Sequence, residues 1–171
     1  MKKTLFIFFI LIFLFIHNIS GQELGSLYTE RSAGFTISMP RGWQTIDVGL
    51  KYLSIRGPQD GSFTPNLVFI DEELVGPLSS YIDVVVGYYP LILSDFRLIN
   101  RATFVTNAGV TAEYVTYQGT MGSISVRQRM YFIPNRRGTT VMQITCTAPF
   151  VGGERYDAVF DASVRTFNWT R

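Results

Sequence analysis

The residues of this chain that could do chemistry are few, and their types exclude several reaction classes. His17 is the only histidine, and it lies in an N-terminal stretch that we expect to be removed. Without His17, a Ser-His-Asp or Cys-His catalytic device is excluded, and so is a zinc site built from histidine and cysteine. The sequence contains no G-x-G-x-x-G pattern and no Walker loop. We therefore expect no cofactor and no enzymatic activity.

Three adjacent acidic residues, Asp71, Glu72 and Glu73, are the candidate metal ligands. Carboxylate oxygens are suitable ligands for a hard cation such as Ca²⁺. Adjacent side chains cannot all point at one ion, however, and no glycine-containing cation loop surrounds them. A solvated loop after a strand is the alternative interpretation. A hydrolase that pairs Asp71 with Glu113 is a weaker hypothesis, because no sequence spacing supports it.

Four arginines are candidates for a patch that binds an anionic ligand. Arg127 and Arg129 lie two residues apart on one face of an expected strand, and Arg136 and Arg137 lie in the turn that follows. Guanidinium groups bind carboxylates and phosphates strongly. A solvated sheet edge that carries charges against unwanted strand pairing accounts for these arginines equally well.

Cys146 is the only cysteine, so the chain cannot form an internal disulfide. It alternates with Met142, Ile144 and Ala148 on one face of an expected strand, which predicts a buried structural thiol. Aromatic residues make up 15% of the chain. This content suits a core, and it also suits a pocket or a surface that contacts a partner.

The N-terminus has the pattern of an export signal. Lys2 and Lys3 precede the apolar run Leu5–Ile16, and a short polar stretch that ends in small residues follows. We therefore expect residues 1–21 to be a signal peptide and residues 22–171 to be a single periplasmic or extracellular domain. An uncleaved anchor is the alternative, although the apolar run is shorter than the roughly 20 residues that span a bilayer. We expect no stable membrane span in the mature chain.

Removal of the signal peptide changes the charge balance. The chain has 15 Lys and Arg against 13 Asp and Glu, so loss of the two N-terminal lysines leaves 15 − 2 = 13 positive charges against 13 negative ones. A neutral domain has no electrostatic reason to bind nucleic acid. We therefore expect no nucleic-acid partner.

The periodicity of the remaining residues predicts the elements that position these side chains. Alternating apolar residues predict strands, and apolar residues three and four apart predict helices. Pro90 should end or kink the first helix. We expect Gln22–Ala33 to be a loosely held lead-in and Asn168–Arg171 to be a tail. The expected order is strands at Phe35–Met39, Tyr52–Arg56 and Asn66–Asp71, a helix at Leu78–Tyr89, strands at Phe96–Thr106, Val110–Gln118, Ser123–Ile133 and Thr139–Ala148, and a helix from Glu154 with Arg165 in its last turn.

Four local motifs accompany this element order. They are F-T-I-S-M-P-R-G-W at Phe35–Trp43, P-N-L-V-F-I at Pro65–Ile70, the hairpin of Asp95–Asn100 with Asn107–Tyr117, and the last-helix aromatics Tyr156, Phe160 and Phe167. Together the element order and these motifs resemble the PsbP/Mog1 family of α/β/α sandwiches. The resemblance implies an α+β fold: a single sandwich with a mostly antiparallel sheet of about six to seven strands and helices on both faces. It also implies that Trp43 packs as part of a corner.

The resemblance also limits the expected function. Members of the family include an extrinsic subunit of the plant photosystem, a nuclear factor that acts on a small GTPase, and many exported bacterial proteins of unknown role. It therefore implies a non-catalytic binding or assembly protein of the cell envelope, whose partner would be an envelope protein or complex. A carrier of a lipid or another apolar ligand is the alternative, and a carboxylate-dependent hydrolase is the least favoured hypothesis.

Overall fold

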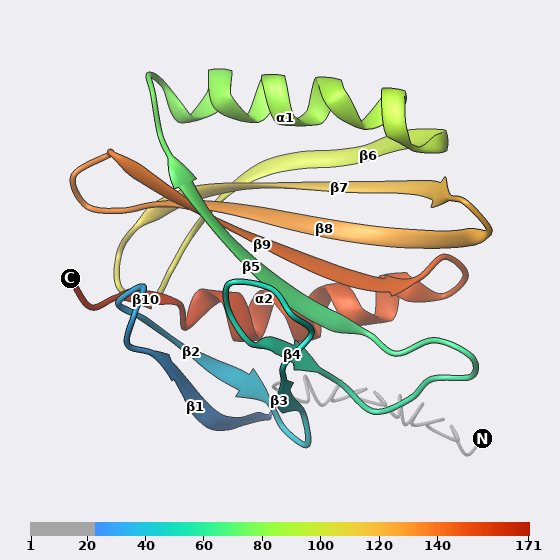
Figure 1. Ribbon diagram of the computed structural model, residues 1–171, viewed down its shortest axis with the longest axis horizontal. Coiled ribbons are helices and arrows are strands. Elements are labelled where there is room, and N and C mark those ends of the chain that lie inside the picture. Colours follow the sequence, from blue (N-terminus) through green and yellow to red (C-terminus); the bar gives the residue numbers. More distant parts are fainter. Residues whose placement is uncertain (1–22) are drawn as a thin grey trace, which may run out of the picture.

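A large antiparallel sheet forms the middle layer of the structure (Figure 1). A computed structural model describes residues 23–171, so the proposed signal peptide lies outside the described residues. The chain-order meander β6-β7-β8-β9 occupies neighbouring positions in this sheet, as the sequence predicted. In spatial order its seven strands are β3 (Gln44–Ile46), β4 (Ser54–Arg56), β5 (Asn66–Glu73), β9 (Thr140–Pro149), β8 (Ile124–Pro134), β7 (Thr111–Met121) and β6 (Ser94–Val105).

Each face of the large sheet carries one helix, and one face carries a second sheet as well. Helix α1 (Leu78–Ile92) lies above the sheet in Figure 1. The opposite face carries helix α2 (Asp157–Arg165), its leading turn η1 (Gly153–Tyr156) and a three-stranded sheet. The order of that small sheet is β1 (Leu24–Glu30), β2 (Phe35–Pro40) and β10 (Asn168–Trp169). The fold is therefore α+β and mostly antiparallel.

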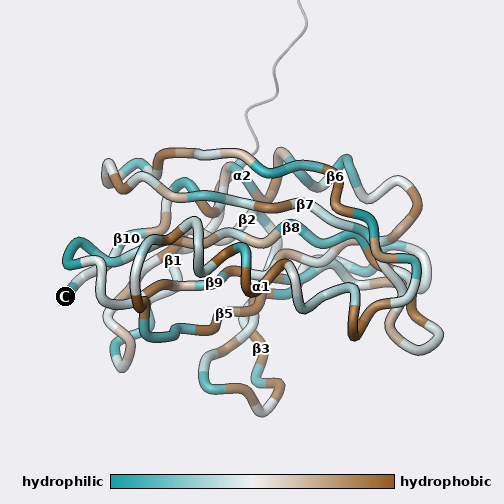
Figure 2. The backbone as a smooth tube through the Cα atoms, turned by 90° about the horizontal axis from the view of Figure 1, so that it is seen from above, coloured by the Kyte–Doolittle hydropathy of each residue, from teal (hydrophilic) through white to brown (hydrophobic). Residues whose placement is uncertain are grey.

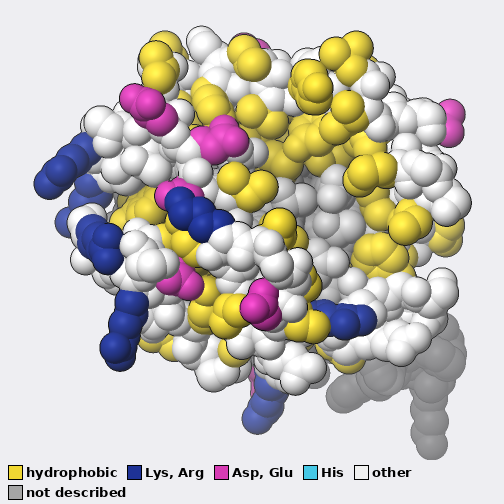
Figure 3. All heavy atoms as spheres, viewed as in Figure 1, with side chains coloured by type: hydrophobic (Ala, Val, Ile, Leu, Met, Phe, Trp, Pro, Cys, Tyr) yellow, Lys and Arg dark blue, Asp and Glu magenta, His cyan; other side chains and the backbone are white. Residues whose placement is uncertain are grey.

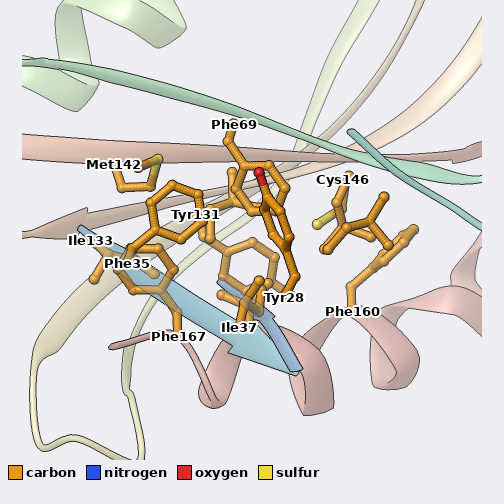
Figure 4. Packing of buried hydrophobic residues seen from close by; sticks show 14 of the residues in the cluster. Tyr28, Phe35, Ile37, Phe69, Tyr131, Ile133, Met142, Cys146, Phe160 and Phe167 are labelled. Atoms are coloured by element: carbon orange, nitrogen blue, oxygen red, sulfur yellow. The ribbon is translucent and has the colours of Figure 1, made fainter. Parts of the chain in front are cut away.

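Strand alternation divides the interior into two cores. On β8, Met130 and Phe132 point toward α1, whereas Tyr131 and Ile133 point toward α2 and the small sheet. The core on the α2 side is the larger one, and Figure 4 shows its aromatic rings packed between the two sheets. Successive side chains of a strand point to opposite faces, so the alternation that predicted the strands also determines which core each side chain enters.

The prediction of a loose lead-in at Gln22–Ala33 is wrong. Strand β1 lies within it and pairs antiparallel with β2. Tyr28 is the buried residue of β1 and packs edge-on against Phe35, with ring centroids 5.9 Å apart. An edge strand with a single buried side chain shows no alternation of apolar residues, so its sequence resembles that of a loop. The predicted tail likewise contains β10, and β3 was not predicted.

The helix ends also differ from the sequence prediction. Helix α1 continues past Pro90 to Ile92, and the Leu93 amide donates a hydrogen bond to the Tyr89 carbonyl (2.9 Å). Pro90 lies within the last turn of this helix, two residues before its end. The N-cap position is Pro77, and no side chain caps the helix. Helix α2 begins later than predicted because Gly153–Tyr156 forms a 3₁₀ turn.

Trp43 is buried, as predicted. Its ring packs edge-on against Phe160 of α2, with centroids 6.1 Å apart. Gly57 makes this position possible, because a Cβ atom there would lie 2.6 Å from Trp43 Cε2. The corner after β2 therefore connects the small sheet to α2 and to the chain beyond β4.

Candidate functional site

Helix α1 covers only part of its face of the large sheet. Val115 and Tyr117 on β7 are fully buried on this face, whereas Ile70 on β5 is 45% exposed. Figure 2, viewed from above, shows the chain at β3 extending beyond the area that α1 covers. We call the uncovered part the open face. It consists of Ile46, Val48, Ser54, Arg56, Asn66, Val68 and Ile70, with Val84, Tyr88 and Ile92 along the adjoining edge of α1.

A hollow of about 360 Å³ lies between β5 and α1, and we call it the α1 groove. Val84 is 75% exposed and Tyr88 is 61% exposed. In Figure 3, hydrophobic side chains gather over the upper and right parts of the molecule, around a hollowed centre. The residues that line the groove are Ile70, Glu72, Val84, Val85, Tyr88, Tyr89, Ile92 and Gln143.

The sequence of α1 explains why apolar side chains remain exposed. One apolar stripe, which includes Ile82 and Val85, packs toward the sheet. A second stripe of Val84, Tyr88 and Leu91 follows the helical spacing i, i+4, i+7 and points to solvent. A surface helix of a monomer usually carries one apolar stripe, so a second exposed stripe marks an interaction surface.

A polar contact at one wall of the groove holds α1 against the sheet. The Tyr81 hydroxyl donates a hydrogen bond to the Glu72 carboxylate, and Gln143 Nε2 donates to the Tyr81 oxygen (2.7 Å). Burial and the bond to Glu72 raise the pKa of Tyr81. Tyr81 therefore remains a neutral donor at physiological pH, and Glu72 is engaged in positioning the helix.

The structure does not bring the three adjacent carboxylates together. Asp71 points to the α2 side, where it accepts hydrogen bonds from Lys51 Nζ (2.6 Å) and the Tyr52 hydroxyl (2.8 Å) beside a polar hollow of about 310 Å³. Glu72 points to α1, and Glu73 is the exposed end of β5. Within residues 23–171, no group of three His, Cys, Asp or Glu side chains is placed to hold a metal ion.

The proposed Asp71–Glu113 pair is also separated. The register aligns Glu113 with Phe132 on β8, Gln143 on β9 and Ile70 on β5. Three strand spacings of roughly 4.8 Å thus lie between Glu113 and β5, about 14 Å in all. Asp71 and Glu113 also point to opposite faces, and Glu113 accepts a hydrogen bond from Arg101 Nε (2.9 Å). These two carboxylates therefore cannot act on one substrate.

Arg127 and Arg129 lie beneath α2, where carboxylates of that helix neutralise them. Arg127 Nη2 is 2.6 Å from Asp157 Oδ2, and Arg129 Nη2 is 2.9 Å from Asp161 Oδ1. The Arg129 guanidinium also stacks on Tyr114, 3.7 Å from its ring centroid. The two side chains therefore attach α2 to the sheet.

The four candidate arginines do not form one patch. Arg136 and Arg137 are exposed in the turn between β8 and β9. Five residues of extended strand, roughly 17 Å, separate Arg129 from the end of β8 at Pro134, and Arg136 lies in the turn beyond it. The alternative of a solvated edge is wrong for Arg127 and Arg129, because β8 lies between β7 and β9 inside the sheet.

Cys146 is a buried structural thiol, as predicted. It is fully buried in the core on the α2 side, and burial raises the pKa of its thiol well above the ordinary value. A thiol that stays protonated and inaccessible is a poor nucleophile. The environment therefore gives Cys146 a packing role.

Solved structures share this architecture over most of its length. The protein CyanoP from Synechocystis sp. PCC 6803 aligns with a TM-score of 0.60 at 15% identity, and the match covers 89% of this chain and 95% of CyanoP. The Ran-binding protein Mog1p from Saccharomyces cerevisiae aligns with a TM-score of 0.61 at 10% identity, covering 86% and 97%. The chain has a PsbP/Mog1-like fold.

A third neighbour with this PsbP/Mog1-like fold is LpqN, which is involved in cell envelope biogenesis of Mycobacterium tuberculosis. It aligns with a TM-score of 0.60 at 17% identity, and the match covers 86% of each chain. No protein-family model and no curated protein sequence matches this chain. At these identities the likeness shows the fold alone.

Sequence reasoning missed the residues that form the open face of this PsbP/Mog1-like fold. The stripe of Val84, Tyr88 and Leu91 shows in the sequence as helical spacing, but the predicted helix rests on the stripe that packs toward the sheet. From the sequence, Arg56 is only the last residue of the strand predicted at Tyr52–Arg56. Nothing in the local sequence distinguishes Arg56 from an ordinary exposed arginine, because its surroundings come from three strands.

Proposed function

We propose that the protein is exported to the cell envelope and acts there by binding a protein partner through the α1 groove. The observation that carries this proposal is the second apolar stripe of α1. It leaves Val84 and Tyr88 mostly exposed beside a hollow. Exposed apolar residues that gather around a groove are typical of interaction sites, because contact with a partner removes them from water.

The structural neighbours support a binding or assembly role in general. Mog1p is named as a Ran-binding protein, and LpqN is described as involved in cell envelope biogenesis. Export of this chain rests on the sequence pattern of residues 1–21. None of the helices within residues 23–171 is both long and apolar enough to cross a membrane.

The groove indicates the kind of partner segment it would accept. Its single charged residue is Glu72, and that carboxylate already accepts a hydrogen bond from Tyr81. Gln143 is the other polar residue of the lining, and its amide already donates to Tyr81. The remaining lining is aliphatic and aromatic, so the complementary segment would present apolar side chains in the groove. Tyr88 is the natural anchor, because tyrosine is enriched among the residues that dominate binding energy at interfaces.

Site-specific photocrosslinking tests this proposal. A benzophenone amino acid replaces Tyr88 in one variant and Leu27 in a second variant, and both are expressed in the envelope. Leu27 is the matched control, because it is an exposed apolar residue on β1 in the opposite layer. We expect one discrete protein adduct from position 88 and none from position 27.

The specificity of that adduct decides the outcome. Excess unlabelled protein should suppress the adduct, and the same excess of a Val84→Asp variant should not. Equal adducts from positions 88 and 27, or none from either position, would contradict the proposed docking surface. Sequencing of the mature N-terminus separately tests cleavage near Gln22.

A carrier of an apolar ligand is the second candidate, because the open face contains two hollows with apolar walls. The aromatic residues that first suggested a carrier are packed against each other, and the Phe35 ring lies 5.3 Å from both Phe69 and Phe167. A carried ligand would therefore have to occupy a surface hollow. Native mass spectrometry of freshly purified protein should show extra mass if this candidate holds, and a clean apo mass would exclude it.

A further inference from the structure

A second hollow on the open face has a composition different from that of the α1 groove. It has a volume of about 270 Å³ and lies where β3, β4 and β5 meet. We call it the β4 hollow. Ile46, Val48 and Val68 supply apolar walls, and Ser54, Arg56, Thr64 and Asn66 supply polar groups.

Strand register explains why these side chains converge. Ile46 on β3 is opposite Ser54 on β4, and Arg56 on β4 is opposite Asn66 on β5. Ser54 and Arg56 are two residues apart and therefore share a face. The intervening Ile55 points into the core and is fully buried. The polar groups thus lie side by side on one face of the sheet, near its β3 edge.

Arg56 brings an unneutralised positive charge to the β4 hollow. Its Nη2 atom donates a hydrogen bond to Thr64 Oγ1 (3.2 Å), and no carboxylate within residues 23–171 forms an ion pair with it. Arg127 and Arg129, by contrast, are both paired with carboxylates of α2. A guanidinium has five N–H donors, so Arg56 retains donors for an anionic ligand.

The Ser54 hydroxyl provides a second and independent indication of a ligand. Ser54 is only 3% exposed, and its Oγ atom is the single buried side-chain polar atom without a hydrogen-bond partner in the part of the chain that the structure describes. Buried polar atoms are nearly always hydrogen-bonded, because an unpartnered one costs free energy. Ser54 is also one of the residues that line the β4 hollow.

We infer that the β4 hollow binds a small monocarboxylate with an apolar body. The carboxylate would accept hydrogen bonds from Arg56 and from the hydroxyls of Thr64 or Ser54. The apolar body would lie against Ile46, Val48 and Val68. At roughly 30 Å³ for each water molecule of the liquid, the volume corresponds to about nine water molecules, which leaves room for a short-chain acid. This site shares no lining residue with the α1 groove. The test of this inference therefore does not depend on whether the α1 groove binds a protein partner.

Titration of hexanoate into the purified ¹⁵N-labelled protein tests the inference. We expect NMR shifts confined to the amides of Ser54–Arg56, the Asn66 amide and the Arg56 side-chain Nε–H. A dissociation constant of about 1 mM is in keeping with a ligand of this size. Hexanol and hexylammonium have the same chain length without the carboxylate, and we expect each to bind at least about tenfold more weakly.

Single substitutions connect the binding to the named residues. Arg56→Gln should weaken hexanoate binding by about tenfold or more, and Arg136→Gln, which removes an exposed arginine from a distant turn, should not change it. Ser54→Ala should weaken binding about threefold without lowering the melting temperature, because it removes a hydroxyl that has no partner. The spectrum of each variant reports whether it folds.

Four results would overturn the inference. These are the absence of saturable shifts, shifts scattered outside the β4 hollow, equal affinity for hexanol, and unchanged affinity in a folded Arg56→Gln variant. N-acetyl-leucine distinguishes a free acid from the C-terminal end of a peptide. Tighter binding of N-acetyl-leucine than of hexanoate at the same residues would identify the small monocarboxylate as the C-terminal end of a peptide.

Discussion

Neighbouring residues of β5 show how differently the two faces of the large sheet are covered. Phe69 points to the α2 side, where it is 2% exposed and lies 5.3 Å from the Phe35 ring. Ile70 points to the α1 side, where it is 45% exposed beside the α1 groove. The α2 side is covered by a helix and a second sheet, whereas the α1 side has one helix for a face of equal width. The α2 side therefore provides most of the packed core, whereas the proposed binding surfaces lie on the α1 side.

The polar contacts follow the same division. On the α2 side, Arg129 is almost fully buried and is held by Asp161 and Tyr131. On the α1 side, Arg101 contacts Asp83 and Glu113 closer to solvent. Charges that are withdrawn from water need their partners, whereas exposed pairs contribute little to stability. Substitutions on the two faces should therefore differ in how much they lower the free energy of unfolding.

The largest expected difference in stability loss is between substitutions at the two neighbouring residues of β5. Phe69→Ala should lower the free energy of unfolding by about 4 kcal/mol, because it leaves a cavity among packed aromatic rings. Ile70→Ala should lower it by less than about 1 kcal/mol, because the side chain is already partly in water. Urea unfolding measures both values, and similar losses would show that the α1 side is as tightly packed as the α2 side.

The next largest difference in stability loss is between substitutions at two aspartates that pair with arginines. Asp161→Ala should cost about 3 kcal/mol, since it deprives the buried Arg129 of its main carboxylate partner. Asp83→Ala should cost less than about 1 kcal/mol, since the Asp83 side chain is 67% exposed and Arg101 keeps Glu113. The same unfolding measurement checks both. A cost for Asp161→Ala as small as that for Asp83→Ala would refute a structural role for the buried pair.

A smaller effect concerns pH and Asp71. Burial by itself would raise the pKa of Asp71, but the hydrogen bonds from Lys51 and Tyr52 outweigh burial and lower it below the ordinary value of 3.8. A carboxyl whose pKa is lower in the folded state stabilises the protein above the unfolded-state pKa. That stabilisation is lost as the pH falls through the lowered value.

Asp71→Asn should therefore reduce stability at neutral pH by less than about 1 kcal/mol, because the Lys51 partner is exposed. The difference from the unsubstituted protein should shrink as the pH falls below about 4. Melting temperatures across that range test this expectation. A constant difference at all pH values would show that the loss comes from packing and not from the charge.

The smallest expected effect on stability is at the outer stripe of α1. Val84→Asp should change the free energy of unfolding by no more than about 0.5 kcal/mol, because the side chain contacts mainly water. The same change should abolish the crosslinked adduct from position 88. A marked loss of stability would mean that Val84 packs as part of the fold and would remove the reason to treat the groove as a docking surface.

Much of the framework followed from local patterns in the sequence. The four-strand meander, the helix beginning at Leu78, the presence of a last helix and the burial of Cys146 were predicted from alternation, spacing and turn residues. The burial of Trp43 was implied by the resemblance to the PsbP/Mog1 family. These features depend on neighbours along the chain. The side a residue faces is set by the period of its own strand or helix.

Only the tertiary structure decided which surfaces are covered. Arg129 and Asp161 are 32 residues apart in sequence, and no local signal shows that they form an ion pair. Strand β1 gains its place by pairing with β2, and Arg56 and Ser54 acquire their surroundings from three strands. The two stripes of α1 are both apolar in sequence, but a helix on one sheet can bury only one of them. Packing therefore determined that Val84 and Tyr88 remain exposed.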